Sequence, residues 1–244
     1  MTSPASAPGA PAFPERAQGP DIAEALQPPA PIPGQPARGL DRLQRIAAAL
    51  ALEAPEAAFY FLRHGQTAGN ARRIFQSPAE PLDDTGIAQA RRAAAALAGE
   101  PLARIVASDA DRAHHTARIV AQAHHALELR TVADLRERHF GALIGTSSAL
   151  IDWDCAPEGG ETLQQFVHRT RDALAAALSG GPAPVLVVAH GGTLYVLAAL
   201  LGIPVTGALL ANAQPLRFAR TPQGRWQAEP LLPPAAPDAA PNLA

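Results

Sequence analysis

The stretch that decides the fold is a short apolar run ending in charged and small residues, Phe59-Tyr60-Phe61-Leu62-Arg63-His64-Gly65-Gln66-Thr67. A continuous apolar run rich in aromatic residues predicts a buried strand. Gly65 allows a sharp turn directly after it. Open α/β sheets bind ligands at the carboxyl ends of their strands, so Arg63 and His64 form a candidate anion site. The alternative is a strand end whose Arg63 and His64 face solvent.

A second strand, Val185 to Ala189, ends in the same manner, with His190-Gly191-Gly192-Thr193. Between and around the two strands the pattern alternates between helices and strands, which predicts an α/β layer fold with a mostly parallel sheet. The predicted helices cover 40–50, 85–98, 112–125, the stretch after the capping box at Thr162 and 193–201, and the other predicted strands cover 102–107, 127–132 and a closing hairpin of 216–220 and 225–231.

Composition divides the chain into four parts. Residues 1–38 are rich in Pro and Ala and are predicted to be a disordered arm, because they cannot bury enough apolar surface to offset the entropy of ordering. Residues 39–56 are predicted to form a short amphipathic helix and a linker, either packed on the domain or free. Residues 57–232 form the predicted catalytic domain, and 233–244 a frayed tail.

Charge and hydropathy narrow the function classes. The net charge of −2 gives no basic excess for a nucleic-acid surface. No apolar run reaches the roughly 20 residues needed to span a bilayer. The N-terminus lacks the pattern of a secretory signal, so we expect a cytoplasmic protein that binds neither nucleic acid nor membrane. The sequence does not indicate the oligomeric state.

A metal site is not expected. His114, His115, His124 and His125 resemble ligand pairs. No carboxylate or cysteine completes a shell at ligand spacing, so they are interpreted as surface histidines of a helix. Cys155 is interpreted as an inert loop thiol, because nothing near it in sequence would lower its pKa.

If both strands are parallel and central, His64 and His190 converge at one edge of the sheet. A guanidinium matches phosphate oxygens, so Arg112 is a candidate second clamp facing Arg63. The amide of Gly191 opens a helix and favours an anion. The alternatives remain a capping role for His190 and an exposed helix position for Arg112.

Glu137 lies among arginines in Leu135-Arg136-Glu137-Arg138-His139-Phe140-Gly141. A carboxyl beside a phosphate dianion can hold a proton for the leaving oxygen, which makes Glu137 a candidate general acid. The alternative is an ordinary surface ion pair.

An ordered set of motifs extends over roughly residues 59–201 and resembles the histidine phosphatase (phosphoglycerate-mutase-like) superfamily. The motifs are Arg63-His64-Gly65-Gln66-Thr67, Asn70, Pro81-Leu82, Gly86 with Gln89-Ala90, Ser108 to Arg112, Thr116-Ala117, Leu135-Arg136-Glu137 with Gly141, Gly159-Gly160-Glu161-Thr162, and Val187-Val188-Ala189-His190-Gly191-Gly192.

The resemblance implies a three-layer α/β/α sandwich, no metal or other cofactor, and a phosphohistidine intermediate on His64. It further implies that Arg63, Arg112 and His190 hold the phosphoryl group of a small phosphorylated substrate. Glu137 matches the position of the general acid and base. Covalent catalysis of this kind divides one difficult displacement into two easier ones.

The loop after the nucleophile departs from the family pattern. Asn70 matches a family donor, and Gln76 occupies a position that commonly touches substrate. Ser77 stands where the family usually has glycine, and the loop is one residue shorter, so we expect a reshaped pocket. Specificity is expected to come from Arg72, Arg73, Arg138, His139 and the segment 145–157.

Three functions remain open from the sequence. The leading hypothesis is metal-independent phosphomonoester hydrolysis. The motif from Glu137 to Leu143 is similar to that of cofactor-dependent phosphoglycerate-type mutases. Mutases of this type carry a longer insertion where this chain has only Ile144 to Pro157, and a short cap leaves a phosphoenzyme open to water. A non-catalytic phosphate-binding module is the third hypothesis.

Overall fold

The two central strands send alternate side chains into two hydrophobic cores. In β1 (Phe59–Arg63), the side chains of Phe59 and Phe61 belong to one core, and those of Tyr60 and Leu62 to the other. β4 (Val185–Ala189) divides its five residues in the same way. Because both faces are covered, these strands appear in the sequence as continuous apolar runs.

The computed structural model describes residues 37–124 and 127–233, all of which belong to one compact unit. Six strands form one sheet in the order β3-β2-β4-β1-β5-β6. The pairs β3–β2, β2–β4 and β4–β1 are parallel, and the pairs β1–β5 and β5–β6 are antiparallel. The bounds of the other strands are β2 (Arg104–Ser108), β3 (Glu128–Val132), β5 (Pro215–Arg220) and β6 (Trp226–Pro230).

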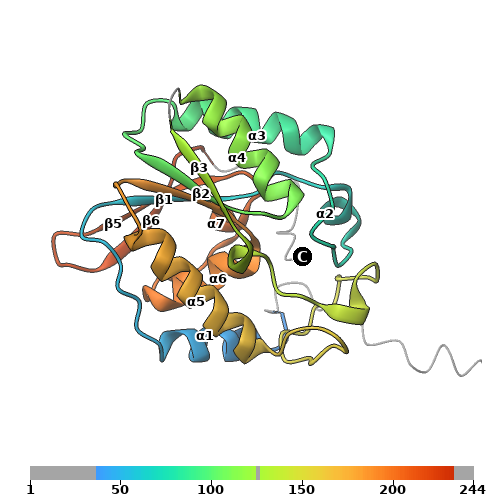
Figure 1. The fold of residues 1–244 in the computed structure, drawn as a ribbon. Coiled ribbons are helices and arrows are strands. Elements are labelled where there is room, and N and C mark those ends of the chain that lie inside the picture. Colours follow the sequence, from blue (N-terminus) through green and yellow to red (C-terminus); the bar gives the residue numbers. More distant parts are fainter. Residues whose placement is uncertain (1–36, 125–126, 234–244) are drawn as a thin grey trace, which may run out of the picture. The chain divides into compact units, whose positions relative to one another are not determined.

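Helices cover both faces of the sheet, which makes the predicted three-layer α/β/α fold correct (Figure 1). α3 (Asp84–Leu97) and α4 (Asp111–Ala123) lie on one face, and α1 (Leu40–Ala48), α5 (Leu163–Ser179) and α6 (Gly191–Leu200) lie on the other. Short helical turns lie outside the layers: α2 (Ala68–Arg72), α7 (Gly207–Leu210), η2 (Ala133–Leu135) and η3 (Gly141–Leu143).

The N-terminal helix α1 is part of the domain. Leu40, Leu43 and Ala47 are buried in the same core as α5 and α6, and α1 contacts both helices. The sequence alone left open whether this helix packs or is free. Its apolar stripe at helical spacing is therefore a packing surface.

Side-chain caps determine where the main helices begin. Thr162 and Gln165 form the predicted capping box at the start of α5, and Asp83 accepts the amide of Gly86 at the start of α3. A second capping box, between Thr67 and Asn70, starts α2 inside the loop that follows β1. α6 begins at Gly191, two residues earlier than predicted, with His190 as its extended N-cap residue.

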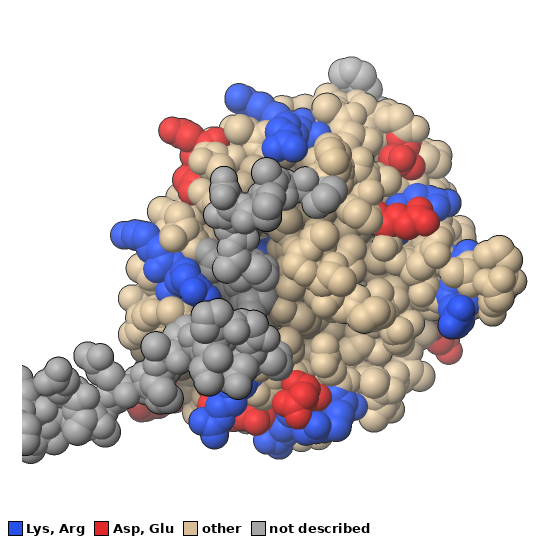
Figure 2. All heavy atoms as spheres, turned by 180° about the vertical axis from the view of Figure 1, so that it is seen from behind, with Lys and Arg blue, Asp and Glu red and all other residues tan. Residues whose placement is uncertain are grey.

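Three predicted features lie wholly or partly outside the described residues, namely the arm (1–36), His125 and the tail (234–244). Among the helices of the described ranges, none has the length and apolarity that crossing a bilayer requires. On the face shown in Figure 2, the charged side chains of the described residues form small groups of both signs and no large basic patch.

Candidate active site

The ends of three parallel strands bring the candidate residues together. His64 follows β1, His190 follows β4, and Ser108 ends β2. The imidazole centroids of His64 and His190 lie 5.1 Å apart. Nε2 of His190 is 2.9 Å from Oγ of Ser108, and the amide of His64 donates to the carbonyl of Ala189. The parallel pairing of β1 with β4 therefore sets the distance between the two imidazoles.

The hydrogen bonds of His64 leave one ring nitrogen available as a nucleophile. Nδ1 lies 2.7 Å from the carbonyl oxygen of Gly65, which can only accept, so Nδ1 carries the proton. Nε2 then holds the lone pair and accepts from Nε of Arg112 at 3.2 Å. Burial, followed by the charges of Arg112 and Arg63, holds the pKa of His64 well below its usual range. His64 is therefore neutral near pH 7.

Two buried guanidiniums flank the His64 imidazole. Arg63 donates from Nη1 to the carbonyl of Leu210 at 2.6 Å, and Arg112 donates from Nη1 to the carbonyl of Ser77 at 2.9 Å. Burial lowers the pKa of each arginine to about 10, so both remain charged at neutral pH. Together they provide the positive charge that a phosphoryl group requires.

Ser77, the residue at the position usually held by glycine, contacts Arg112 through its backbone carbonyl. A carbonyl contact is available to any residue, so this departure from the family pattern keeps the support for the guanidinium.

Glu137 is held by two backbone amides. Oε1 accepts from the amide of Arg138 at 2.9 Å, and Oε2 accepts from the amide of Gly192 at 2.8 Å, in the first turn of α6. A helix N-terminus stabilises a carboxylate. The Gly192 amide is thus already bonded to a side chain of the protein. Gly191 lies beside Arg63, since a Cβ built on it would be 3.6 Å from the guanidinium carbon.

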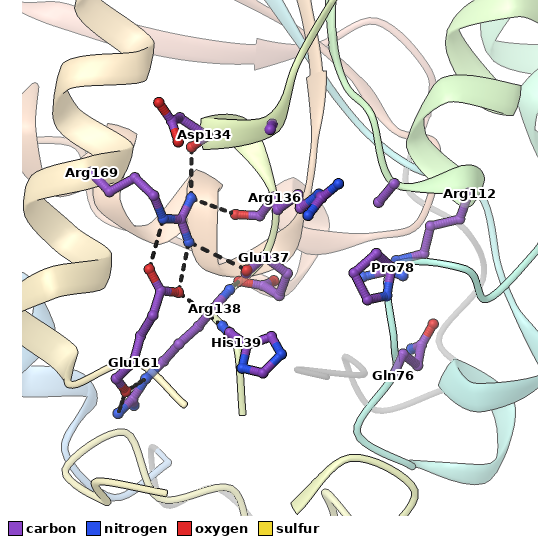
Figure 3. Close-up of a pocket in the computed structure, with 12 residues that line it drawn as sticks. Gln76, Pro78, Arg112, Asp134, Arg136, Glu137, Arg138, His139, Glu161 and Arg169 are labelled. Carbon is purple, nitrogen blue, oxygen red and sulfur yellow. Dashed lines mark hydrogen bonds and ion pairs between the residues drawn. The ribbon is translucent and has the colours of Figure 1, made fainter. Parts of the chain in front are cut away.

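Arg169 of α5 fastens the segment that carries Glu137. Its guanidinium donates to both carboxylate oxygens of Glu161 at 2.7 Å, and to the carbonyls of Asp134 at 2.6 Å, Arg136 at 3.1 Å and Glu137 at 3.4 Å (Figure 3). The backbone of residues 134–137 is therefore hydrogen bonded to α5, which limits the movement of the Glu137 carboxylate.

A pocket of about 310 Å³ opens at Arg112 and Glu137 (Figure 3). Arg63, His64 and His190 are not among its lining residues and are at most 2% exposed. Arg63, His64 and His190 thus lie deeper than the open part of the site, whereas Arg112 lines it. The lining residues are Gln76, Pro78, Ala110, Arg112, Ala133, Asp134, Arg136, Glu137, Arg138, His139, Glu161 and Arg169.

The loop after β1 is built around Asn70 and Gln76. Asn70 completes the capping box with Thr67, and its Oδ1 lies 3.3 Å from Nδ2 of Asn212. Nδ2 of Asn212 also donates to the carbonyl of His64 at 3.0 Å. Oε1 of Gln76 accepts from Oγ1 of Thr67 at 2.8 Å, and Gln76 lines the pocket. Asn212 was not predicted from the sequence, where its only signal is that it is a polar residue within an apolar stretch.

Arg138 does not have the specificity role expected from the sequence. Its side chain is buried and donates to the carbonyls of Trp153, Cys155 and Glu161. It holds the 153–155 loop, and each of its three nitrogens already donates to a backbone carbonyl. Burial raises the pKa of the Cys155 thiol, in keeping with an inert cysteine.

The other residues expected to give specificity lie in two places. Arg72 and Arg73 are exposed and do not line the pocket, whereas His139 does.

Within the described ranges, no three His, Cys, Asp or Glu residues are grouped so that they could hold a metal ion.

Comparison with known proteins finds both mutases and phosphatases that are similar to this chain. A 2,3-bisphosphoglycerate-dependent phosphoglycerate mutase of Azorhizobium caulinodans is 34% identical over 164 residues, which is 57% of this chain and 79% of the mutase. A glucosyl-3-phosphoglycerate phosphatase of Mycobacterium tuberculosis is 34% identical over 168 residues, 59% of this chain and 75% of the phosphatase.

The fold also matches solved structures. The mycobacterial glucosyl-3-phosphoglycerate phosphatase in complex with VO3 superposes with a TM-score of 0.59 at 31% identity, covering 71% of this chain and 97% of that one. The family model of the histidine phosphatase superfamily (branch 1) matches residues 59–227. The chain therefore belongs to the histidine phosphatase superfamily.

Proposed function

We propose that the protein hydrolyses phosphomonoesters of small molecules without a metal ion, through a phosphohistidine on His64. The observation that carries the proposal is the environment of the His64 imidazole: Nδ1 is bound to the carbonyl of Gly65, Nε2 holds the lone pair, and Arg112 lies 3.2 Å away. A neutral imidazole held between two cations attacks a phosphoryl dianion without charge repulsion.

The first half of the reaction transfers the phosphoryl group to the enzyme. Nε2 of His64 forms a bond to phosphorus as the ester P–O bond breaks, and protonated Glu137 gives its proton to the leaving alkoxide. Arg63, Arg112 and His190 surround the transferred group and stabilise its charge. The alcohol then leaves through the pocket on the side of Glu137.

The second half returns the enzyme to its starting state. Glu137, now a carboxylate, takes a proton from water as the water oxygen attacks phosphorus and the N–P bond breaks. Inorganic phosphate leaves, and the proton on Glu137 serves the next cycle. One carboxyl thus acts as acid and then as base.

A phosphoglycerate-type mutase is the second candidate function. The motif from Glu137 to Leu143 and the similarity to the Azorhizobium mutase favour it. The short connection of residues 144–157 favours hydrolysis, because a mutase must keep water from its phosphoenzyme. We therefore place hydrolysis first.

The test compares the wild type with His64→Ala and with His115→Ala, an exposed histidine of α4 that serves as the control. Para-nitrophenyl phosphate and a panel of phosphorylated metabolites are assayed with EDTA present. The wild type and His115→Ala should release phosphate and carry an acid-labile phosphoryl group, and His64→Ala should do neither. Activity in His64→Ala, or loss of wild-type activity in EDTA, would overturn the proposal. Isomerisation of a phosphoglycerate faster than its hydrolysis would establish the mutase instead.

A further inference from the structure

The pocket beyond the phosphoryl site is rich in arginine, yet most of these guanidiniums already have partners. Four arginines line it: Arg112, Arg136, Arg138 and Arg169. Arg112 faces the nucleophile, and its Nη2 has no hydrogen bond to a described residue, so it is the guanidinium that remains for the phosphoryl group. What the other three can offer decides which alcohols fit the pocket.

Arg138 and Arg169 are committed to the protein. All three nitrogens of Arg138 donate to backbone carbonyls, and the residue is 3% exposed. Arg169 donates to both oxygens of Glu161 and to carbonyls from Asp134 to Glu137. Drawing either guanidinium toward a ligand would leave buried carbonyls or a carboxylate without a donor, which costs more than the new contact returns.

Arg136 already forms a bidentate ion pair with Asp109, in the geometry that a ligand carboxylate would need. Nε and Nη2 of Arg136 each lie 2.6 Å from an oxygen of Asp109. A ligand carboxylate that displaced Asp109 would exchange one such pair for another. The displaced Asp109 carboxylate would stay nearby and repel the ligand, so the exchange yields no net attraction.

The remaining ionisable residues that line the pocket are three carboxylic acids and one histidine. Asp134, Glu137 and Glu161 line the pocket, and no described basic residue forms an ion pair with the Asp134 side chain. The imidazole of His139 borders the pocket, and its Nδ1 accepts the amide of Gly141 at 3.3 Å. Among the described lining residues, no guanidinium is left to neutralise a second anion.

We infer that the site selects phosphomonoesters whose alcohol part is uncharged and discriminates against alcohols that carry a carboxylate or a second phosphate. This inference rests on the proposed phosphomonoester hydrolysis. It assigns substrate choice to the pairing of Arg136 with Asp109 and to the commitment of Arg138 and Arg169, and it sets this chain apart from an enzyme for phosphoglycerates.

The test uses two ligands that differ at one group. Racemic α-glycerol phosphate and 3-phosphoglycerate share a three-carbon phosphomonoester skeleton, with a hydroxymethyl group in the first and a carboxylate in the second. Each competes against para-nitrophenyl phosphate hydrolysis by the full-length wild type at about pH 8, where an ordinary imidazole is neutral. The inhibition constant of 3-phosphoglycerate should exceed that of α-glycerol phosphate by about tenfold or more, as an unpaired charge requires.

Equal inhibition constants, or tighter binding of 3-phosphoglycerate, would overturn the inference and leave the proposed hydrolysis intact. Absence of any His64-dependent hydrolysis of para-nitrophenyl phosphate would instead overturn the proposed function and the inference with it. The two failures are therefore distinguishable in one series of assays.

A matched pair of variants tests the assignment to Arg136. Asp109→Asn removes the carboxylate partner of Arg136, and the difference between the two inhibition constants should narrow at least threefold. Asp172→Asn removes the carboxylate partner of Arg171 on α5, an ion pair of 3.0 Å whose residues do not line the pocket, and should leave the difference as it is. A difference that is unchanged in Asp109→Asn would overturn the assignment to this pair.

Discussion

Gly192→Ala is expected to displace the carboxylate of Glu137 while leaving the other proposed catalytic side chains in place. A Cβ on Gly192 would overlap Oε1 of Glu137, and would lie 3.0 Å from Cδ of the carboxyl and 2.9 Å from Cη2 of Trp153. The Trp153 ring is fully buried, so the carboxylate must yield and lose the 2.8 Å bond from the Gly192 amide. A displacement of about 1 Å in a positioned group costs about 100-fold in rate.

The stability of Gly192→Ala should change little. Losing the carboxylate bond costs about 1 to 2 kcal/mol, and alanine in a helix returns about 1 kcal/mol relative to glycine. Gly191→Ala is the comparator, since its Cβ would make only ordinary contact with Arg63 at 3.6 Å. We expect Gly191→Ala to lose far less activity than its neighbour.

The assay that isolates Glu137 follows the first turnover by rapid quenching with two esters. An alkyl phosphate has a poor leaving group and needs the proton from Glu137, whereas para-nitrophenolate leaves without one. Gly192→Ala should therefore slow release of the alkyl alcohol about tenfold more than release of para-nitrophenol. Equal losses for both esters would refute the assignment of Glu137 as the general acid.

Three further outcomes are expected. The free energy of unfolding should fall by about 1 kcal/mol for each of His64 and His190 as the pH is lowered from about 6.5 to 5.5, because burial lowers both folded pKa values and the unfolded chain alone takes up protons there; urea unfolding of His64→Gln should show a smaller loss over the same range. Arg169→Gln should lower kcat about tenfold with little change in KM, whereas Arg171→Gln on the same helix should not. Trp153→Ala should cost about 3 to 5 kcal/mol in thermal or urea unfolding, because the ring is fully buried.

The layers of the fold were predictable because local patterns and tertiary packing agree. Two apolar runs covered on both faces and alternating helices predict a mostly parallel sheet, and the strands β3, β2, β4 and β1 are parallel. The α2 turn was not predicted, because five residues carry no periodicity and its Thr67–Asn70 capping box is a weak signal. α7 was missed for the same reason of length.

The strand-end residues of the site were also accessible from the sequence, since parallel strands bring their carboxyl ends to one edge. The partners that hold them were not. Leu210 and Asn212 reach Arg63 and His64 across more than 140 positions of the chain. The partners of Arg138 could not be predicted either. Whether an arginine contacts a ligand or backbone carbonyls depends on the conformation of the surrounding loops, which the sequence pattern does not specify.

The charge of the site is suited to a dianion, as the proposed function requires. Glu137 is hydrogen bonded to the amides of Arg138 and Gly192, while Arg63 and Arg112 keep their charges in a buried setting that lowers each pKa to about 10. The two guanidiniums give the centre a positive charge, and burial opposes that charge. A phosphoryl dianion balances the two positive charges when Glu137 is protonated, and the charge on its oxygens during transfer meets donors that are already in place. Backbone carbonyls hold the guanidiniums of Arg63 and Arg112 in position. Little reorganisation of these donors is therefore needed during the proposed reaction.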